Sequence, residues 1–417
     1  MNNSNSDLKE SGNPADVDHL SKKNNEYPER YNVNQIWLKK LFKRYYFDYF
    51  SNIKMPEEIH SREFGFRQFD GKINRHLSFT SLGELHAYIL KLVPSDIYCS
   101  SSFYKKPHEE MDKKEWYGSE LIFDIDGKDL NLKCAIEHNY TKCHVCSFIN
   151  KGILKSCNNC SSSRLSVIDM PCKNCVFFLK EEVKKLKKLL IGDLGIDDKT
   201  ISIYFSGNNG FHIHVFDEDY YELVSNERSE LASYIMGKGF KLETLGIKVD
   251  NEKKNASLLK SKRILDLGWR GRVLKYIKLN ISSIKNNNVL TKYIEKLESS
   301  WNCSFQQIVS RAVEDLSVKL DPVVTMDIHR IFRLNGSLNS KSGLAKIICS
   351  DIDSFDPFKD ACFYGKSEVE IDSKIDSTIY FNGKKFVLNN GFNVIPEYLA
   401  TYLISKGLVN INLKETK

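Results

Sequence analysis

The sequence lacks a long hydrophobic run: nowhere in its 417 residues is there a stretch near the roughly 18 apolar residues needed to cross a bilayer. The first residues also lack the apolar core of a secretory signal. A membrane-spanning or exported protein is therefore not expected. We expect a cytoplasmic protein, in which the eleven cysteines stay reduced and do not pair as disulfides.

A strong excess of one charge is also missing. Lys and Arg number 61 and Asp and Glu 54, which gives a net charge of +7. This is a modest bias toward a polyanionic partner such as nucleic acid, and lysines that keep the surface soluble would explain it as well. Charge alone therefore does not identify the partner.

The chain has no internal repeat and divides by composition into four parts. Residues 1–30 have almost no apolar spacing and predict a mobile tail, because they cannot offset the entropy lost on ordering. Residues 31–225 and 319–417 indicate two parts of one core, and the lysine-rich stretch 226–318 indicates a mainly helical accessory region. Strands and helices alternate irregularly, which predicts an α+β (mixed α/β) fold and not a doubly wound sheet.

Local patterns place the individual elements. Apolar residues three and four apart predict helices, and alternation around turn residues predicts strands and hairpins. Helices are expected at 36–50, 81–94, 176–195 and up to 408 near the C-terminus; a hairpin is expected at 61–79, and strands at 120–127, 201–216 and 319–325.

A pair of carboxylates, Asp124 and Asp126, ends the apolar strand predicted at 120–127. Residues two apart in a strand point to the same face, so both carboxylates project together while Ile125 enters the opposite layer. They repel each other unless a cation lies between them or one is protonated, and Mg²⁺ or Mn²⁺ would suit such a pair. A strand that simply ends in an Asp-Gly turn is the alternative.

A glycine-flanked turn, SGNNG, begins at Ser206 and leads into the strand FHIHV. The N–H groups between Gly207 and Gly210, with the serine hydroxyl, could form an anion-binding concavity for a triphosphate. His212 and His214 share one strand face beside this turn, so His212 could donate to a phosphate oxygen. The alternative is a plain hairpin turn followed by two incidental histidines.

A third motif begins at Asp321, which directly follows the apolar end of an element and is therefore preferred over Asp327 as a second metal-binding position. Guanidinium groups bind phosphate through two parallel hydrogen bonds, so a basic segment here could clamp a triphosphate. The polar side chains of this segment are Arg330, Arg333, Ser337 and Lys341.

Seven of the eleven cysteines crowd into an insertion at 134–175. Two Cys-x-x-Cys pairs separated by 10 residues are typical of a zinc ribbon, and a third pair stands just before the predicted helix at 176–195. The ribbon pairs are Cys143 with Cys146 and Cys157 with Cys160; the third pair is Cys172 with Cys175, and Cys134 stands alone. A single zinc ion with spare thiols is the alternative, because one pair could be idle.

In this order the motifs resemble the small catalytic subunit of archaeal and eukaryotic DNA primases, most closely the archaeal branch. The resemblance implies a mixed core built on two sheets, zinc near the active site and an attached helical region. The matching strings are REFGF at 62–66, RHLSF at 75–79, LIFDID at 121–126, the cysteine pair at 172–175, YFSGNNGFHIHV at 204–215 and LDPVVTMDIHRIFRLNGSL at 320–338.

The resemblance assigns roles to individual residues. Two catalytic Mg²⁺ or Mn²⁺ ions would be held by Asp124, Asp126 and Asp321. The nucleotide contacts would be Arg62, Ser206, Gly207, His212, Arg333 and Lys341. Relatives often carry arginine where Asn208 and Asn209 stand and histidine in place of Asn339, so the triphosphate should depend more on the remaining basic residues, Arg333, Lys341 and His212.

The resemblance also completes a second zinc site, because relatives place a Cys and a His shortly after the Asp-x-Asp strand. We therefore expect two zinc ions. His144 is a competing ligand for the ion that the resemblance adds, the one held by Cys134 and His138 with the pair Cys172 and Cys175. One ion would be held by Cys134, His138, Cys172 and Cys175, and the other by Cys143, Cys146, Cys157 and Cys160.

The function that the resemblance implies is primer synthesis on single-stranded DNA from nucleoside triphosphates, by two-metal nucleotidyl transfer that releases pyrophosphate. A heterodimer with a large primase subunit that carries an iron–sulfur cluster is also implied. Two alternatives remain: a primase-polymerase of repair or of a mobile element that extends existing ends, and a zinc-ribbon protein that only binds single-stranded nucleic acid.

Overall fold

The computed structural model describes residues 33–239, 247–250, 255–258, 267–279 and 298–412. The predicted tail at 1–30 and parts of the predicted helical region at 226–318 lie outside these ranges. No helix in the described ranges is both long and apolar enough to cross a membrane. The helices are α1 (Val33–Asp48), α2 (Leu82–Leu92), α3 (Ala135–His138), α4 (Lys173–Leu194), α5 (Ser225–Ile235), α6 (Gly268–Leu279), α8 (Phe305–Leu316), α9 (Pro322–Met326), α10 (Pro357–Asp360) and α11 (Glu397–Lys406).

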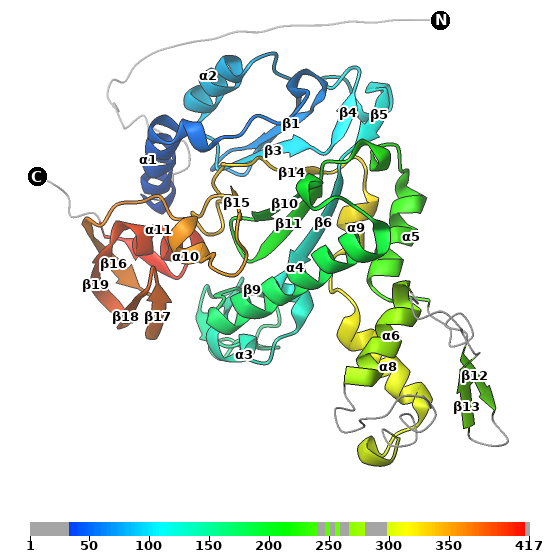
Figure 1. Ribbon diagram of the computed structural model, residues 1–417. Helices are drawn as coiled ribbons and strands as arrows, with labels where there is room; N and C mark the ends of the chain where they lie inside the picture. The colour runs from blue at the N-terminus through cyan, green and yellow to red at the C-terminus, as the bar shows by residue number, and fades with distance from the viewer. Residues whose placement is uncertain (1–32, 240–246, 251–254, 259–266, 280–297, 413–417) are drawn as a thin grey trace, which may run out of the picture. The chain divides into compact units, whose positions relative to one another are not determined.

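Two antiparallel four-stranded sheets form the core, as the resemblance implied (Figure 1). The first sheet has the order β14-β3-β1-β2, and the second has the order β15-β10-β11-β6. Strands of the first are β1 (Phe64–Arg67), β2 (Ile73–Leu77), β3 (Asp96–Ser100) and β14 (Ile331–Arg333); strands of the second are β6 (Leu121–Asp126), β10 (Ile201–Phe205), β11 (Gly210–Val215) and β15 (Ile347–Ile348). Each sheet thus combines early strands with one late strand.

Helix α4 covers one face of the second sheet through contacts with β6 and β11. Its leucines and valine at helical spacing are buried in the same cluster as the odd-numbered residues of both strands. Burying one such side chain contributes about 1.5–3 kcal/mol. The packed set is Phe123, Ile125, Phe211, Ile213 and Val215 from the sheet, with Leu179, Val183, Leu186 and Leu190 from the helix. The even-numbered side chains therefore point to the opposite face, toward the first sheet.

Several predicted elements are confirmed. The hairpin of β1 and β2 turns at Gly71, whose φ of 89° suits glycine. Helix α2 ends at Val93, directly before Pro94, and α4 ends at the left-handed cap Gly195.

The strand predicted at 319–325 is wrong. Pro322 occupies the first turn of the short helix α9, and Asp321 is its N-cap, accepting from the N–H of Val323 at 3.0 Å. Proline fits the start of a helix because its missing N–H has no partner there in any case. The β-branched residues that suggested a strand are outweighed by this capping signal.

Besides these two sheets, the described residues form two three-stranded sheets and three two-stranded ones, β4–β5, β12–β13 and β17–β18. The cysteine-rich insertion forms the sheet β8-β7-β9, and the C-terminal part forms the sheet β19-β16-β20 beside the hairpin β17–β18. The remaining strands are β4 (Ser102–Tyr104), β5 (Trp116–Ser119), β7 (Tyr140–Cys143), β8 (Ile149–Lys151), β9 (Leu165–Ile168), β12 (Ile247–Asp250), β13 (Asn255–Leu258), β16 (Glu368–Ser373), β17 (Ser377–Phe381), β18 (Lys384–Leu388), β19 (Gly391–Pro396) and β20 (Val409–Ile411). Within 226–318, the described part thus contains the hairpin β12–β13 besides helices.

Candidate active site

The candidate catalytic acids lie on the face of the second sheet that α4 leaves uncovered. Strands β6 and β11 pair so that His212 lies directly opposite Asp124 and His214 opposite Ile122. The His212 Nε2 atom is 3.6 Å from Asp124 Oδ1, and its Nδ1 atom is buried with no hydrogen-bond partner in the described part of the chain. The predicted strand face and its alternation are therefore confirmed.

Asp321 reaches this face from a distant part of the sequence. Its backbone N–H donates to the carbonyl oxygen of Asp124 at 3.0 Å. The buried side chains of Ile122, Val324 and Phe332 form one small cluster that joins β6, α9 and β14. This cluster fixes the start of α9 beside the end of β6, so the third predicted carboxylate lies next to the first pair.

Asp124 lies in surroundings that disfavour the charged form of its carboxyl group. Burial first, and then the negative charges of Asp126 and Asp321, together raise the pKa of Asp124 to about 7, while Lys128 and Arg330 oppose the shift. Oxygen ligands of this kind suit Mg²⁺ or Mn²⁺. Among the described residues, the oxygens of the three carboxylates do not all lie within 4.8 Å of one another.

A pH dependence of ion binding follows from the raised pKa. Below pH 7 a divalent ion must displace a proton from Asp124, and above pH 7 it neutralises a carboxylate whose burial destabilises the fold. We therefore expect added Mg²⁺ to raise the melting temperature more at pH 8 than at pH 6. The affinity of the protein for Mg²⁺ should fall by up to about tenfold for each pH unit below 7. Thermal melts with and without Mg²⁺ test this, and Asp124→Asn should remove the pH-dependent part. An equal rise at both pH values would contradict it.

In the glycine-flanked turn beside these acids, the backbone lies too close to neighbouring segments to leave room for side chains. Gly207 has a φ of +85°, and a side chain at Gly210 would meet the Ile125 carbonyl oxygen at 2.5 Å, so both positions require glycine. The Ser342 hydroxyl donates to the Gly207 carbonyl, and the Gly127 N–H donates to that of Asn209 at 2.8 Å. The turn is therefore held by the residue that follows β6 and by the distant segment that carries Lys341.

Arg333 and Lys341, two basic residues of the third motif, differ in how far the protein itself already pairs their charges. Arg333 donates through Nη1 to Asp96 Oδ1 at 2.7 Å and to the Leu338 carbonyl at 2.6 Å. Although burial would raise it, the pKa of Asp96 is lowered, chiefly by Arg333 and by hydrogen bonds from Ser340. Lys341 is exposed. The charge of Arg333 is thus already partly neutralised, whereas that of Lys341 is open to a ligand.

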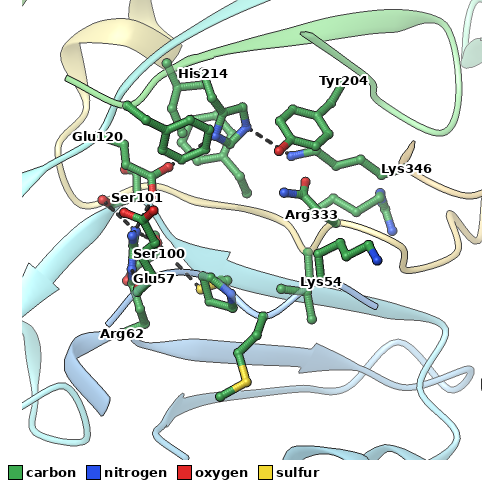
Figure 2. Close-up of a pocket in the computed structure, with 18 residues that line it drawn as sticks. Lys54, Glu57, Arg62, Ser100, Ser101, Glu120, Tyr204, His214, Arg333 and Lys346 are labelled. Carbon is green, nitrogen blue, oxygen red and sulfur yellow. Dashed lines mark hydrogen bonds and ion pairs between the residues drawn. The ribbon is translucent and has the colours of Figure 1, made fainter. Parts of the chain in front are cut away.

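A cavity of about 240 Å³ lies between the two sheets and is lined by both Arg62 and Arg333 (Figure 2). Arg62 donates to carbonyl oxygens of Glu57, Ser100 and Ser101 at 2.9–3.0 Å and forms an ion pair with Glu120. Its donors are therefore largely occupied by the protein itself. This arrangement favours a role of Arg62 in building the cavity wall over direct contact with a phosphate.

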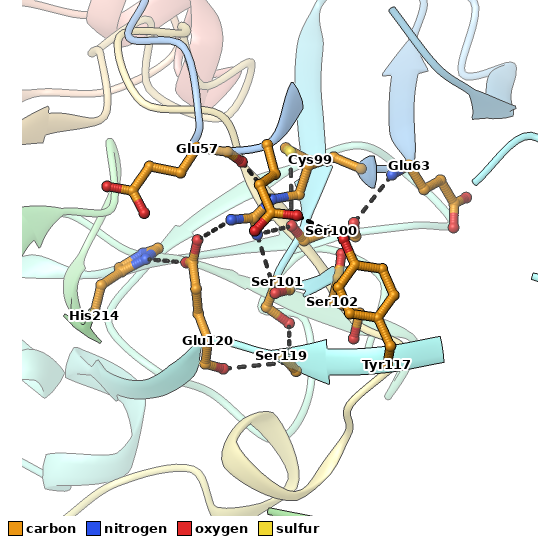
Figure 3. A network of polar contacts seen from close by, with 12 residues as sticks. Glu57, Glu63, Cys99, Ser100, Ser101, Ser102, Tyr117, Ser119, Glu120 and His214 are labelled. Carbon is orange, nitrogen blue, oxygen red and sulfur yellow. Dashed lines mark hydrogen bonds and ion pairs between the residues drawn. The ribbon is translucent and has the colours of Figure 1, made fainter. Parts of the chain in front are cut away.

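The Arg62–Glu120 pair continues into a buried polar network (Figures 2 and 3). His214 Nδ1 is 3.1 Å from Glu120 Oε2, and its Nε2 is 3.2 Å from Lys346 Nζ. Burial lowers the pKa of Lys346 to about 7 and that of His214 to about 4. The ring of Phe332 contacts both His212 and His214, so this network adjoins the carboxylate face.

Both predicted zinc-ligand sets come together in the structure. Zinc–sulfur bonds of about 2.3 Å in a tetrahedron place sulfur atoms about 3.8 Å apart. In the first set the Sγ–Sγ distances are 3.7–4.0 Å, and His138 Nε2 is 3.2 Å from Cys175 Sγ. In the second set Cys143 and Cys160 are 3.5 Å apart, and Cys146 and Cys157 are 3.7 Å apart. Among the residues that the structure describes, His144 belongs to neither group.

Comparison with known proteins identifies the family. The family model described as DNA primase small subunit matches residues 163–349. The DNA primase small subunit PriS of Nitrosopumilus maritimus is 39% identical over 376 residues, which cover 90% of this chain and 98% of the relative. The chain belongs to the DNA primase small-subunit family. The PriS proteins of Cenarchaeum symbiosum and Archaeoglobus fulgidus are 36% and 32% identical, each over 90% of this primase subunit and 98% of the relative.

Three polar residues near the active site of this primase subunit were not found from the sequence. Glu120 and Lys346 become neighbours of His214 only through the pairing of β6 with β11 and the position of β15. Lys406, at the end of α11, contacts Asn208 in the glycine-flanked turn. A lone lysine or glutamate carries no motif, so no sequence signal marked these positions.

Proposed function

We propose that this primase subunit makes primers by template-directed nucleotidyl transfer, with Asp124, Asp126 and Asp321 as ligands of divalent ions. The observation that carries the proposal is the meeting of Asp321 with Asp124 through a backbone hydrogen bond, beside His212. Membership of the family supports nucleotidyltransferase activity, single-stranded DNA and nucleoside triphosphates as substrates, and a large subunit as partner.

Each group in the site would have a separate task in this reaction. Divalent ions would supply the charge that activates a 3′-hydroxyl and neutralises the departing pyrophosphate. The turn at Ser206 and Gly207 would receive phosphate oxygens through its N–H groups. Lys341 would contribute a point charge, and Arg333 would orient the phosphates to the extent that Asp96 leaves its donors available.

His212 should contact the triphosphate as a neutral imidazole, because burial and then Lys346 lower its pKa well below the usual value. We expect His212→Ala to raise the KM for nucleotide roughly ten- to hundredfold, the size of one hydrogen bond to a charged group. Binding of single-stranded DNA should change less. Steady-state incorporation kinetics and a DNA-binding titration measure the two effects.

His214→Ala is the matched control on the same strand face. His214 lies between Glu120 and Lys346, so its loss removes the hydrogen-bond partner of Glu120 Oε2 and of Lys346 Nζ and should lower the melting temperature. If His214→Ala raises the KM and His212→Ala does not, the assignment of His212 is wrong.

Incorporation of labelled nucleotides on unprimed single-stranded DNA tests the proposed function directly. A primase should make short products without a primer, and more of them with a large subunit added. Products only on primed templates would favour a primase-polymerase that extends existing ends. DNA binding without any incorporation, unaffected by changes at Asp124, would favour a non-enzymatic binding protein.

A further inference from the structure

Lys406, the last residue of helix α11, lies against the glycine-flanked turn of the active site. Its ammonium group donates to Asn208 Oδ1 at 2.8 Å, a contact across 198 positions of the chain. Lys406 is only 9% exposed, and no ion pair of the described residues includes it. Burying an ammonium group without a carboxylate partner is costly, so a purely structural lysine is not expected here.

Helix α11 holds this lysine in a fixed position. At its N-terminal end, Glu397 forms an ion pair with Arg44 and accepts from the Gly365 N–H at 2.8 Å. At its C-terminal end, Gly407 adopts a φ of +73° as a left-handed cap. Nearly every side chain between these ends is buried. The helix dipole favours a cation at Lys406, but this effect is smaller than the penalty of burial.

The same helix also supports the segment that carries Lys341. A side chain at Gly343 would meet Thr401 Cγ2 at 2.8 Å, so α11 packs directly on this segment. The pKa of Lys406 is lowered to about 8, chiefly by burial and also by Lys341, while Asp169 and Asp126 oppose the shift. The helix therefore touches both segments assigned to the triphosphate.

We propose that Lys406 is a positioning residue of the nucleotide site, which holds Asn208 and places a positive charge beside the turn that receives the triphosphate. This inference depends on the proposed function. It explains how a turn with two asparagines, Asn208 and Asn209, can be cationic: the charge comes from the C-terminal helix. Because Lys406 acts through Asn208, its loss should weaken nucleotide binding and leave the chemical step intact.

Nucleotide-incorporation kinetics on primed single-stranded DNA test this inference. Lys406→Met should raise the KM for nucleotide about tenfold, the size of one charge-assisted contact, and change kcat by less than about twofold. Lys406→Arg should restore the KM to within about threefold. Asn208→Ala should act in the same direction, and the double variant should be no worse than Lys406→Met alone, because the two residues act as a unit.

Lys374 provides the matched control. It is an exposed lysine whose backbone N–H donates to the Leu408 carbonyl, two residues beyond Lys406, and it has no contact with the turn among the described bonds. Lys374→Met should leave the KM unchanged.

An unchanged KM in Lys406→Met, with Asp124→Asn inactive, would overturn the inference and leave the proposed function standing. If Lys406→Met and Lys406→Arg lose kcat and melting temperature to the same extent, Lys406 has only a structural role and the inference is wrong. An active Asp124→Asn would instead reject the proposed function.

Discussion

Asp124→Asn should abolish nucleotide incorporation, with a loss on the order of a thousandfold or more, because the charge stabilisation by a bound ion is worth several kcal/mol. The same change should leave the melting temperature of the ion-free protein unchanged or raise it. The reason is that Asp124 is buried beside Asp126 and Asp321, and removing its charge relieves both burial and repulsion. Incorporation assays and thermal melts at pH 8 measure the two effects.

Asp321→Asn and Asp327→Asn form the matched pair for this prediction. Each side chain accepts a hydrogen bond from a backbone N–H two residues on, at 3.0 Å, which asparagine can also accept. Only Asp321 is bonded to the backbone of Asp124. We therefore expect Asp321→Asn to be inactive and Asp327→Asn to be active. The opposite result would move the third metal ligand to Asp327.

Purified protein should contain two zinc ions per chain by elemental analysis. Replacing Cys157 and Cys160 together by Ser should remove one ion and leave the other, because the two ligand sets are separate. Structural zinc sites in small peptides contribute about 10–16 kcal/mol at pH 7, as much as the whole stability of many domains. Loss of an ion should therefore unfold its surroundings, which limited proteolysis within 134–175 would detect.

The double change of Cys172 and Cys175 should also remove one ion but cost more stability. Cys175 is buried in the first turn of α4, the helix that covers the catalytic sheet. Cys303→Ser, outside both sets, should keep two ions and serves as the control. A content near one zinc per chain, insensitive to the change at Cys157 and Cys160, would show that the second site does not exist.

The sequence predicted those parts of the site that local pattern determines. Strand alternation predicted that Asp124 and Asp126 share one face and that His212 and His214 share one face, and the pairing of β6 with β11 then puts His212 opposite Asp124. The cysteine spacing identified the insertion as a metal-binding region. The partition of ligands, with His138 in the first set, came from the family resemblance and matches the groups that the structure forms.

What the sequence did not reveal depends on contacts between distant segments. Arg333 looked like a free phosphate ligand, but β14 pairs with β3 and brings it to Asp96. Arg62 also looked like a free phosphate ligand, but its partners Ser100 and Ser101 lie at the end of β3, far away in the sequence. The strand expected at 319–325 is a different kind of error, because the Asp321–Pro322 start of helix α9 is a local signal that the β-branched residues obscured.

The late strands β14 and β15 have a consequence for the newborn chain on the ribosome. Asp321 follows Asp126 by 195 residues, which at 5–20 residues per second takes roughly 10–40 s to synthesise. During that interval β3 and β10 each have one edge that later pairs with β14 or β15 and is still open. Open edges recruit strands from other chains, so the unfinished chain is most exposed to aggregation in the same interval in which it lacks a complete active site.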